Sequence, residues 1–146
     1  MDKLNLAAVF VASLMPIFFG FIYYHPKALG NVWMRANGFT LESLKGGPKP
    51  ILFLGVYVMS LMLSLWCGLQ FMDVHQTSLD FNDQPHDWTT WHHGVAHGFA
   101  YTMFFVLPMM GINAVFERRS LSYVLVHLGY WLITLCTMNA VLSAWR

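Results

Sequence analysis

The sequence predicts an all-α, polytopic membrane protein with four transmembrane helices in a bundle. Of its 146 residues, 57% are hydrophobic and only 10% are charged, whereas a soluble domain has about 25% charged residues. Four apolar stretches each reach about 20 residues, the length that a helix needs to cross a bilayer. We therefore expect one transmembrane domain over residues 1–146, with the lipid bilayer as its partner.

The first two predicted spans are about residues 5–24 and 51–72. The first ends in bulky aromatic residues without a small-residue cleavage site, which favours an uncleaved span over a signal peptide. Pro16 lies inside it and is expected to kink the helix or free a carbonyl. Pro48 and Pro50 precede the second span, where proline suits a helix start.

The other two predicted spans are about residues 88–116 and 121–145, with Asp87 as the N-cap of the third. Only residues 117–120 connect them. A connection this short joins antiparallel neighbours, so the third and fourth helices are predicted to form a tight antiparallel hairpin.

The two longer connections differ in composition. Residues 25–50 include the segment Ala28–Ala36, where Trp33 and Arg35 indicate a short helix in the membrane interface. Residues 73–87 carry four aspartates and neither lysine nor arginine. The two connections should lie on opposite sides of the bilayer, because one span separates them.

The distribution of lysine and arginine predicts the orientation. The connections 25–50 and 117–120 share one side of a four-span protein and hold six of these residues: Lys27, Arg35, Lys45, Lys49, Arg118 and Arg119. Lys3 and Arg146 are on the other side. The positive-inside rule therefore predicts a multi-pass protein of the cell membrane with both termini outside. The net charge of +1 argues against a nucleic-acid partner, which requires a basic face.

A histidine cluster lies at the start of the third span. His93 and His97 are four residues apart, so they share one helix face and can bind one metal ion together. Zinc or copper suits imidazole ligands, and haem is a further alternative. Additional ligands could come from His75, His86, His92 and Asp87. The open alternative is that the pair simply forms hydrogen bonds with a neighbour.

Gly94 and Gly98 form a small-xxx-small motif on the same side of the third helix. Such a motif lets a second backbone approach closely, so it is predicted to be a helix-packing site. A second copy of the chain is one candidate for that neighbour. The sequence therefore predicts a homo-oligomer, either a dimer or a trimer.

Several further polar side chains are predicted within or at the ends of the spans. If residues 118 and 119 mark the hairpin turn, Asn139 lies near the level of His97 and could orient its imidazole. His127 would then lie about 20 Å from His97 along the bundle axis, too far to share one ion. An ionisable group in a span is functional by default, or else a neutral imidazole that donates to a tyrosine or carbonyl. The other polar candidates are Tyr101, Tyr130 and Asn113.

Short motifs at the helix ends resemble the domain-of-unknown-function 1761 family of small four-helix membrane proteins. The motifs are residues 16–26, 33–34, 113–119, 129–131 and 144–145. The resemblance implies the four-helix architecture over nearly the whole chain and brings no assigned chemistry. The histidine cluster departs from the family pattern.

Two function classes follow from these observations. The favoured one is a non-enzymatic membrane protein that forms a small-solute or ion pathway, or an oligomeric assembly module. The alternative is a metal- or haem-binding membrane protein, catalytic or not, with the histidine cluster at its outer face. The sequence leaves open whether the protein is an enzyme.

Overall fold

The computed structural model describes residues 4–71 and 89–145. The acidic segment 73–87 and the candidate ligands His75, His86 and Asp87 lie outside these residues. In the described ranges all regular secondary structure is helical, which confirms the predicted all-α fold class. The elements are α1 (Leu6–Ala12), α2 (Met15–Tyr23), α3 (Gly30–Asn37), α4 (Pro50–Leu69), α5 (Trp91–Tyr101), the π-helical segment η1 (Thr102–Val106), α6 (Leu107–Phe116) and α7 (Leu121–Ala144).

Four helical segments are long and apolar enough to cross a membrane: Leu6–Tyr23, Pro50–Leu69, Trp91–Phe116 and Leu121–Ala144. Their outer faces expose large apolar side chains, among them Phe104 and Phe116. Lipid solvates such a surface and water does not.

The first span is broken rather than merely kinked. Pro16 has no N–H to donate, and α1 ends before it while α2 begins beside it. Two serines of α4 bond the backbone at the break. The Ser60 hydroxyl donates to the Ser13 carbonyl, and the Ser64 hydroxyl donates to the Val9 carbonyl over 2.8 Å. The Ser60 bond gives the Ser13 carbonyl a donor next to the break, and the Ser64 bond is a second one for the Val9 carbonyl, which also accepts from the Ser13 backbone N–H over 2.9 Å.

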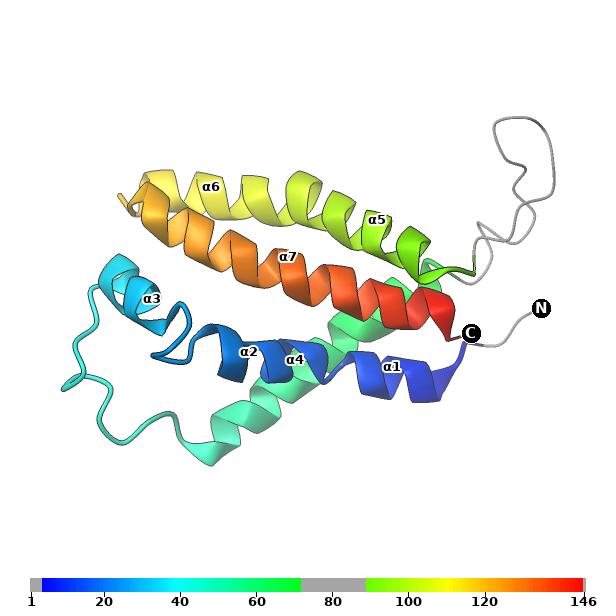
Figure 1. Cartoon of the computed structure of the whole chain (residues 1–146), viewed down its shortest axis with the longest axis horizontal. Coiled ribbons are helices and arrows are strands. Elements are labelled where there is room, and N and C mark those ends of the chain that lie inside the picture. Colours follow the sequence, from blue (N-terminus) through cyan, green and yellow to red (C-terminus); the bar gives the residue numbers. More distant parts are fainter. Residues whose placement is uncertain (1–3, 72–88, 146) are drawn as a thin grey trace.

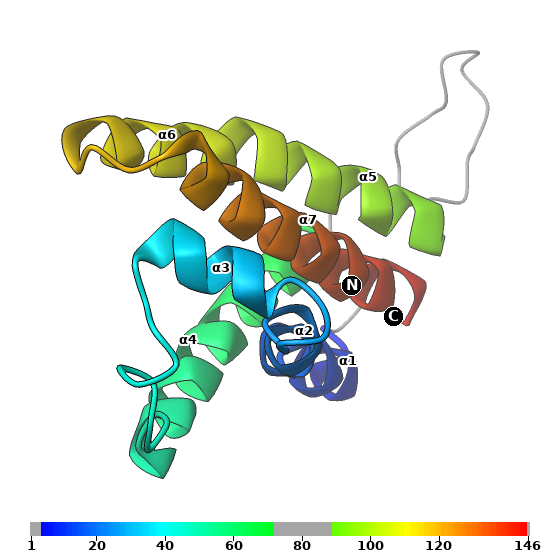
Figure 2. The ribbon, with the colours of Figure 1, turned by 60° about the vertical axis from the view of Figure 1, so that its left-hand side comes forward.

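The predicted short helix after the first span is present as α3. A tight turn precedes it, and a Cβ on Gly30 would come within 2.8 Å of the His25 carbonyl carbon. The left-handed Gly38, with φ of 74°, ends the helix. α3 turns back and packs on α7 (Figure 2).

The third span contains a change of helix type. Thr90 caps α5 by accepting from the His93 backbone N–H, so the helix begins at Trp91 rather than near residue 88. η1 follows, and the buried Thr102 hydroxyl donates to the Gly98 carbonyl over 2.8 Å. Pro108 lies just after this wider turn, where a missing N–H is easier to accommodate.

α5 and α7 lie side by side (Figures 1 and 2). Gly94 lies against the backbone of Asn139, and Gly98 lies against that of Leu135 and Cys136. His97 is therefore level with Cys136, about one helical turn from the position that the turn residues predicted. The π-helical turn contributes to this offset because it inserts a residue that α7 does not match.

The core lies where α1, α4 and α7 meet. Its fully or nearly fully buried apolar members are Ala8, Val9, Ala12, Cys67, Phe71, Leu135, Met138 and Leu142. Figure 1 places the starts of α1 and α5 and the end of α7 at one end of the molecule, which we call the Trp91 end. α3 and the connection between α6 and α7 lie at the opposite end, the Trp33 end.

Candidate functional site

The first polar cluster, which we call the His93 cluster, consists of His93, His97, Tyr101 and Phe71 at the Trp91 end. The Nε2 atoms of His93 and His97 are 2.9 Å apart, and both side chains are half-buried. The other ring nitrogen of His97, Nδ1, lies 3.3 Å from the Tyr101 hydroxyl. The Phe71 ring meets both imidazoles edge-on, with centroids 5.1 and 6.0 Å away. The i,i+4 spacing therefore places two imidazole nitrogens close together on one face of α5.

The two glycines of α5 fix this cluster against α7. A Cβ on Gly98 would come within 2.5 Å of the backbone nitrogen of Cys136, and one on Gly94 would clash with the Asn139 carbonyl. The predicted close-packing face is therefore covered by α7 of the same chain. A second copy of the chain would have to use a different face.

Two of the expected neighbours of the pair take other positions. The exposed His92 stacks on Trp91 with ring centroids 3.5 Å apart. Asn139 donates to the Leu135 carbonyl over 2.9 Å and lies 3.8 Å from the Cys67 sulfur. The bonds described for Asn139 thus go to α7 and α4, and the Nδ1 atom of His97 faces Tyr101 rather than Asn139. Among the described residues, no group of three His, Cys, Asp or Glu side chains could hold a metal ion.

The second polar cluster, the His127 cluster, consists of His127, Tyr24, Asn37, Tyr123 and Tyr130 near the Trp33 end. The Tyr24 hydroxyl lies 3.1 Å from Nδ1 of His127, and the Asn37 amide nitrogen lies 3.4 Å from Nε2. The same amide nitrogen donates to the Trp33 carbonyl over 2.8 Å. An amide nitrogen can only donate, so Nε2 accepts, and the neutral ring carries its proton on Nδ1 and donates it to Tyr24.

Aromatic rings surround this histidine. The Tyr123 ring meets the His127 ring with centroids 4.7 Å apart, and the Tyr24 ring lies 5.1 Å from that of Tyr130 and 5.3 Å from that of Trp33. Burial, and then the neighbouring tyrosines, raise the pKa of the Tyr24 phenol above its ordinary value. The hydroxyl therefore keeps its proton and remains available for hydrogen bonding.

Sequence reasoning found His127 and Tyr130 but missed Tyr24 and Asn37. Tyr24 follows α2 and Asn37 ends α3, so no spacing rule along the chain connects either one with His127. The available signal was the predicted interfacial helix Ala28–Ala36, which Asn37 follows directly in the sequence. Asn113, a further predicted polar residue, lies exposed on α6.

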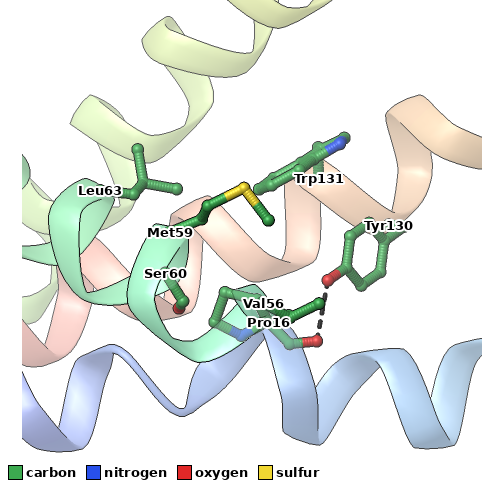
Figure 3. A pocket seen from close by; sticks show the side chains of 7 residues that line it. All are labelled: Pro16, Val56, Met59, Ser60, Leu63, Tyr130 and Trp131. Carbon is green, nitrogen blue, oxygen red and sulfur yellow. Dashed lines mark hydrogen bonds between the residues drawn. The ribbon is translucent and has the colours of Figure 1, made fainter. Parts of the chain in front are cut away.

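The apolar core of α7 lies at the level of the His93 cluster. Leu135, whose carbonyl lies against Gly98, and Met138 are almost fully buried there. The Tyr130 hydroxyl donates to the carbonyl of Pro16 in α2 over 2.8 Å (Figure 3). His97 bonds with His93 and Tyr101 at the Trp91 end, and His127 bonds with Tyr24 and Asn37 near the Trp33 end.

Comparison with known proteins identifies the family of the chain. The model of a family described as Protein of unknown function (DUF1761) matches residues 7–143, nearly the whole chain. This match confirms the resemblance drawn from the helix-end motifs. No curated protein and no solved structure matches the chain. The chemistry of this protein therefore has to be argued from its own residues.

Proposed function

The chain belongs to the DUF1761 family of proteins of unknown function, and we propose that it is a multi-pass membrane protein whose His93–His97 pair binds a transition-metal ion, zinc or copper. One observation carries the proposal: the Nε2 atoms of the two imidazoles converge to 2.9 Å on one face of α5. Imidazole nitrogen is a preferred ligand of both metals.

The distance suits a chelating pair after a small adjustment. Two nitrogens on one tetrahedral zinc ion lie about 3.3 Å apart, given Zn–N bonds of about 2.0 Å. Opening the pair from 2.9 Å to that value is a change of about 0.4 Å between two half-buried side chains. Tyr101 would keep its bond to Nδ1 of His97, which is the kind of outer contact that orients a ligating histidine.

Haem suits this geometry less well. Two axial histidines must approach the iron from opposite faces of the macrocycle. His93 and His97 lie one turn apart on the same face of one helix and point to the same place. The pair could therefore supply only one axial ligand, whereas a small ion can take both nitrogens.

The setting favours entry of a cation. The pair lies in the first turns of α5, at the end of a candidate span rather than in its middle. In the sequence, the segment with Asp73, Asp80, Asp83 and Asp87 comes immediately before this helix. Such a concentration of negative charge raises the local concentration of cations.

The rival function, a small-solute or ion pathway, has less support. A pathway requires polar groups that continue from one end of the bundle to the other. The hydrogen bonds described for His97 go to His93 and Tyr101, and those described for His127 go to Tyr24 and Asn37, so these bonds do not form a chain between the two clusters. The localisation in the cell membrane, the outside position of both termini and the homo-oligomeric assembly remain proposals, and each is tested below.

Calorimetric titration of the purified full-length chain in detergent tests the proposal. Zinc chloride and copper(II) chloride are titrated separately into the wild type, the double variant His93→Ala/His97→Ala and the control His92→Ala. The control removes a neighbouring imidazole that stacks on Trp91. Wild type and control are expected to bind one equivalent of metal, and the double variant is expected to lose that isotherm. Identical isotherms for all three proteins, or no binding to the wild type, would contradict the proposal.

A further inference from the structure

A cavity of about 270 Å³ lies between α2, α4 and α7, and Tyr130 is the one residue that it shares with the His127 cluster. Figure 3 shows its lining, formed by Pro16, Val56, Met59, Ser60, Leu63, Tyr130 and Trp131. We propose that this cavity binds one acyl chain of a membrane phospholipid. The proposal does not depend on metal binding by the His93–His97 pair.

The chemistry of the lining favours a hydrocarbon ligand. The two hydroxyl groups in the lining already donate to backbone carbonyls, Tyr130 to that of Pro16 and Ser60 to that of Ser13. Figure 3 shows the indole nitrogen of Trp131 at the end of its ring away from Met59. The lining therefore presents carbon and sulfur surface to a ligand. A head group with charges or hydroxyls would lose its hydration there without gaining partners.

The volume fits part of a lipid tail. An apolar cavity of about 150 Å³ stays free of water and binds benzene. The cavity described here is larger, and both hydroxyl groups in its lining already donate to carbonyls, so water would find few partners in it. An empty space of this size would cost packing energy, because its lining atoms would lack contacts on one side.

The position of the cavity gives a tail direct access from the bilayer. Val56 and Met59 line it and are also 38% and 63% exposed on α4, near the middle of that candidate span. Met59 lies about 14 Å along the axis from Pro50 at 1.5 Å per residue. Half of a bilayer's hydrocarbon core is about 15 Å thick. A lipid with its head group level with the start of α4 can therefore place its chain in the cavity.

Photo-crosslinking in lipid nanodiscs tests the proposal. The full-length chain is reconstituted with phosphatidylcholine that carries a diazirine in the acyl chain or, in a second arm, in the head group. Peptide mapping is expected to find the acyl-chain adducts concentrated on the cavity lining. The head-group probe is expected to leave the lining unlabelled. Equal labelling by both probes would overturn the assignment to an acyl chain.

Two variants on adjacent positions of α4 separate cavity binding from general contact with lipid. Leu63→Trp places an indole in the cavity, and Met62→Trp places the same group on a surface that is 67% exposed. Leu63→Trp should reduce adducts on Pro16 and Trp131 by at least about fivefold because the indole takes up the free volume. Met62→Trp should leave them unchanged. Equal adduct yields in both variants would contradict the proposal.

A second cavity-filling variant is used if Leu63→Trp fails to fold, and a second crosslinking readout tests whether another copy of the chain occupies the cavity. If Leu63→Trp loses its helical circular-dichroism signal, Val56→Phe fills the same cavity from a position two turns earlier in α4 and is expected to give the same result. A benzoylphenylalanine at position 59 is expected to yield a lipid adduct. A covalent dimer in its place would assign the cavity to a second copy of the chain and overturn the lipid proposal.

Discussion

Tyr24 and His127 are 103 positions apart in the sequence, and their side chains meet, with the tyrosine hydroxyl 3.1 Å from Nδ1 of the imidazole. Asn37 fixes the proton on that nitrogen by donating to the other one. The contact joins the end of the first span to the fourth span, and the bond between Asn37 and His127 joins α3 to α7. The Tyr24–His127 contact is therefore a tertiary contact between two helical segments that are distant in the sequence.

Tyr24→Phe is expected to destabilise the protein by about 1–2 kcal/mol, because it leaves the Nδ1–H of His127 without an acceptor in a partly buried site. Thermal unfolding in detergent measures the change. Tyr57→Phe on α4 is the control, since no hydrogen bond to its hydroxyl is found among the described residues. A Tyr24→Phe melting temperature equal to that of the control would show that the contact contributes nothing to stability.

Gly98→Ala is expected to cost about 1–3 kcal/mol of stability, because the added methyl group would overlap the backbone of α7 at Leu135 and Cys136. Gly94→Ala should lower the stability similarly, because its methyl group would overlap the backbone carbonyl of Asn139. Gly111→Ala, in the same span, meets nothing within 4 Å and should be neutral or slightly stabilising. Three equal denaturation midpoints would mean that α5 and α7 do not pack this closely.

The charge distribution predicts that residue 80 is outside the cell and residue 45 is inside. Single cysteines introduced as Asp80→Cys and Lys45→Cys, in a chain with Cys67→Ala and Cys136→Ala, are labelled in intact cells with a membrane-impermeant maleimide. Position 80 should react at once, and position 45 should react only after permeabilisation. The reason is that the side of the membrane with position 45 carries six lysines and arginines, which the positive-inside rule places in the cytoplasm. The reverse pattern would invert the orientation.

The protein is expected to form a homodimer or homotrimer in the membrane. The Gly94–Gly98 face is already covered by α7, so the contact has to involve another surface, such as the exposed apolar side of α6 with Met109 and Phe116. Native mass spectrometry in mild detergent gives the stoichiometry. Only monomer at every protein concentration would count against this prediction. Phe116→Ser should lower the oligomer fraction if α6 forms the contact.

Much of the architecture followed from local sequence features. The apolar stretches predicted four helices of membrane-spanning length, and Pro16 predicted a disruption in the first of them. The spacing of His93 and His97 predicted that their imidazoles share one face. Each of these results depends on helix geometry or on a missing N–H, which are properties of a few neighbouring residues.

The pairing of distant segments was decided only by the tertiary structure. Asn139 lies one turn from its expected position because α5 and α7 pack in a register that the π-helical turn and the two glycines set, and a count from the connecting turn does not include either effect. Tyr24, Asn37 and His127 come together because α3 folds back onto α7. The sequence by itself determined which segments are helical and which side chains share a face. It did not determine which faces meet, because contacts between apolar helices depend on shape along their whole length rather than on any short pattern.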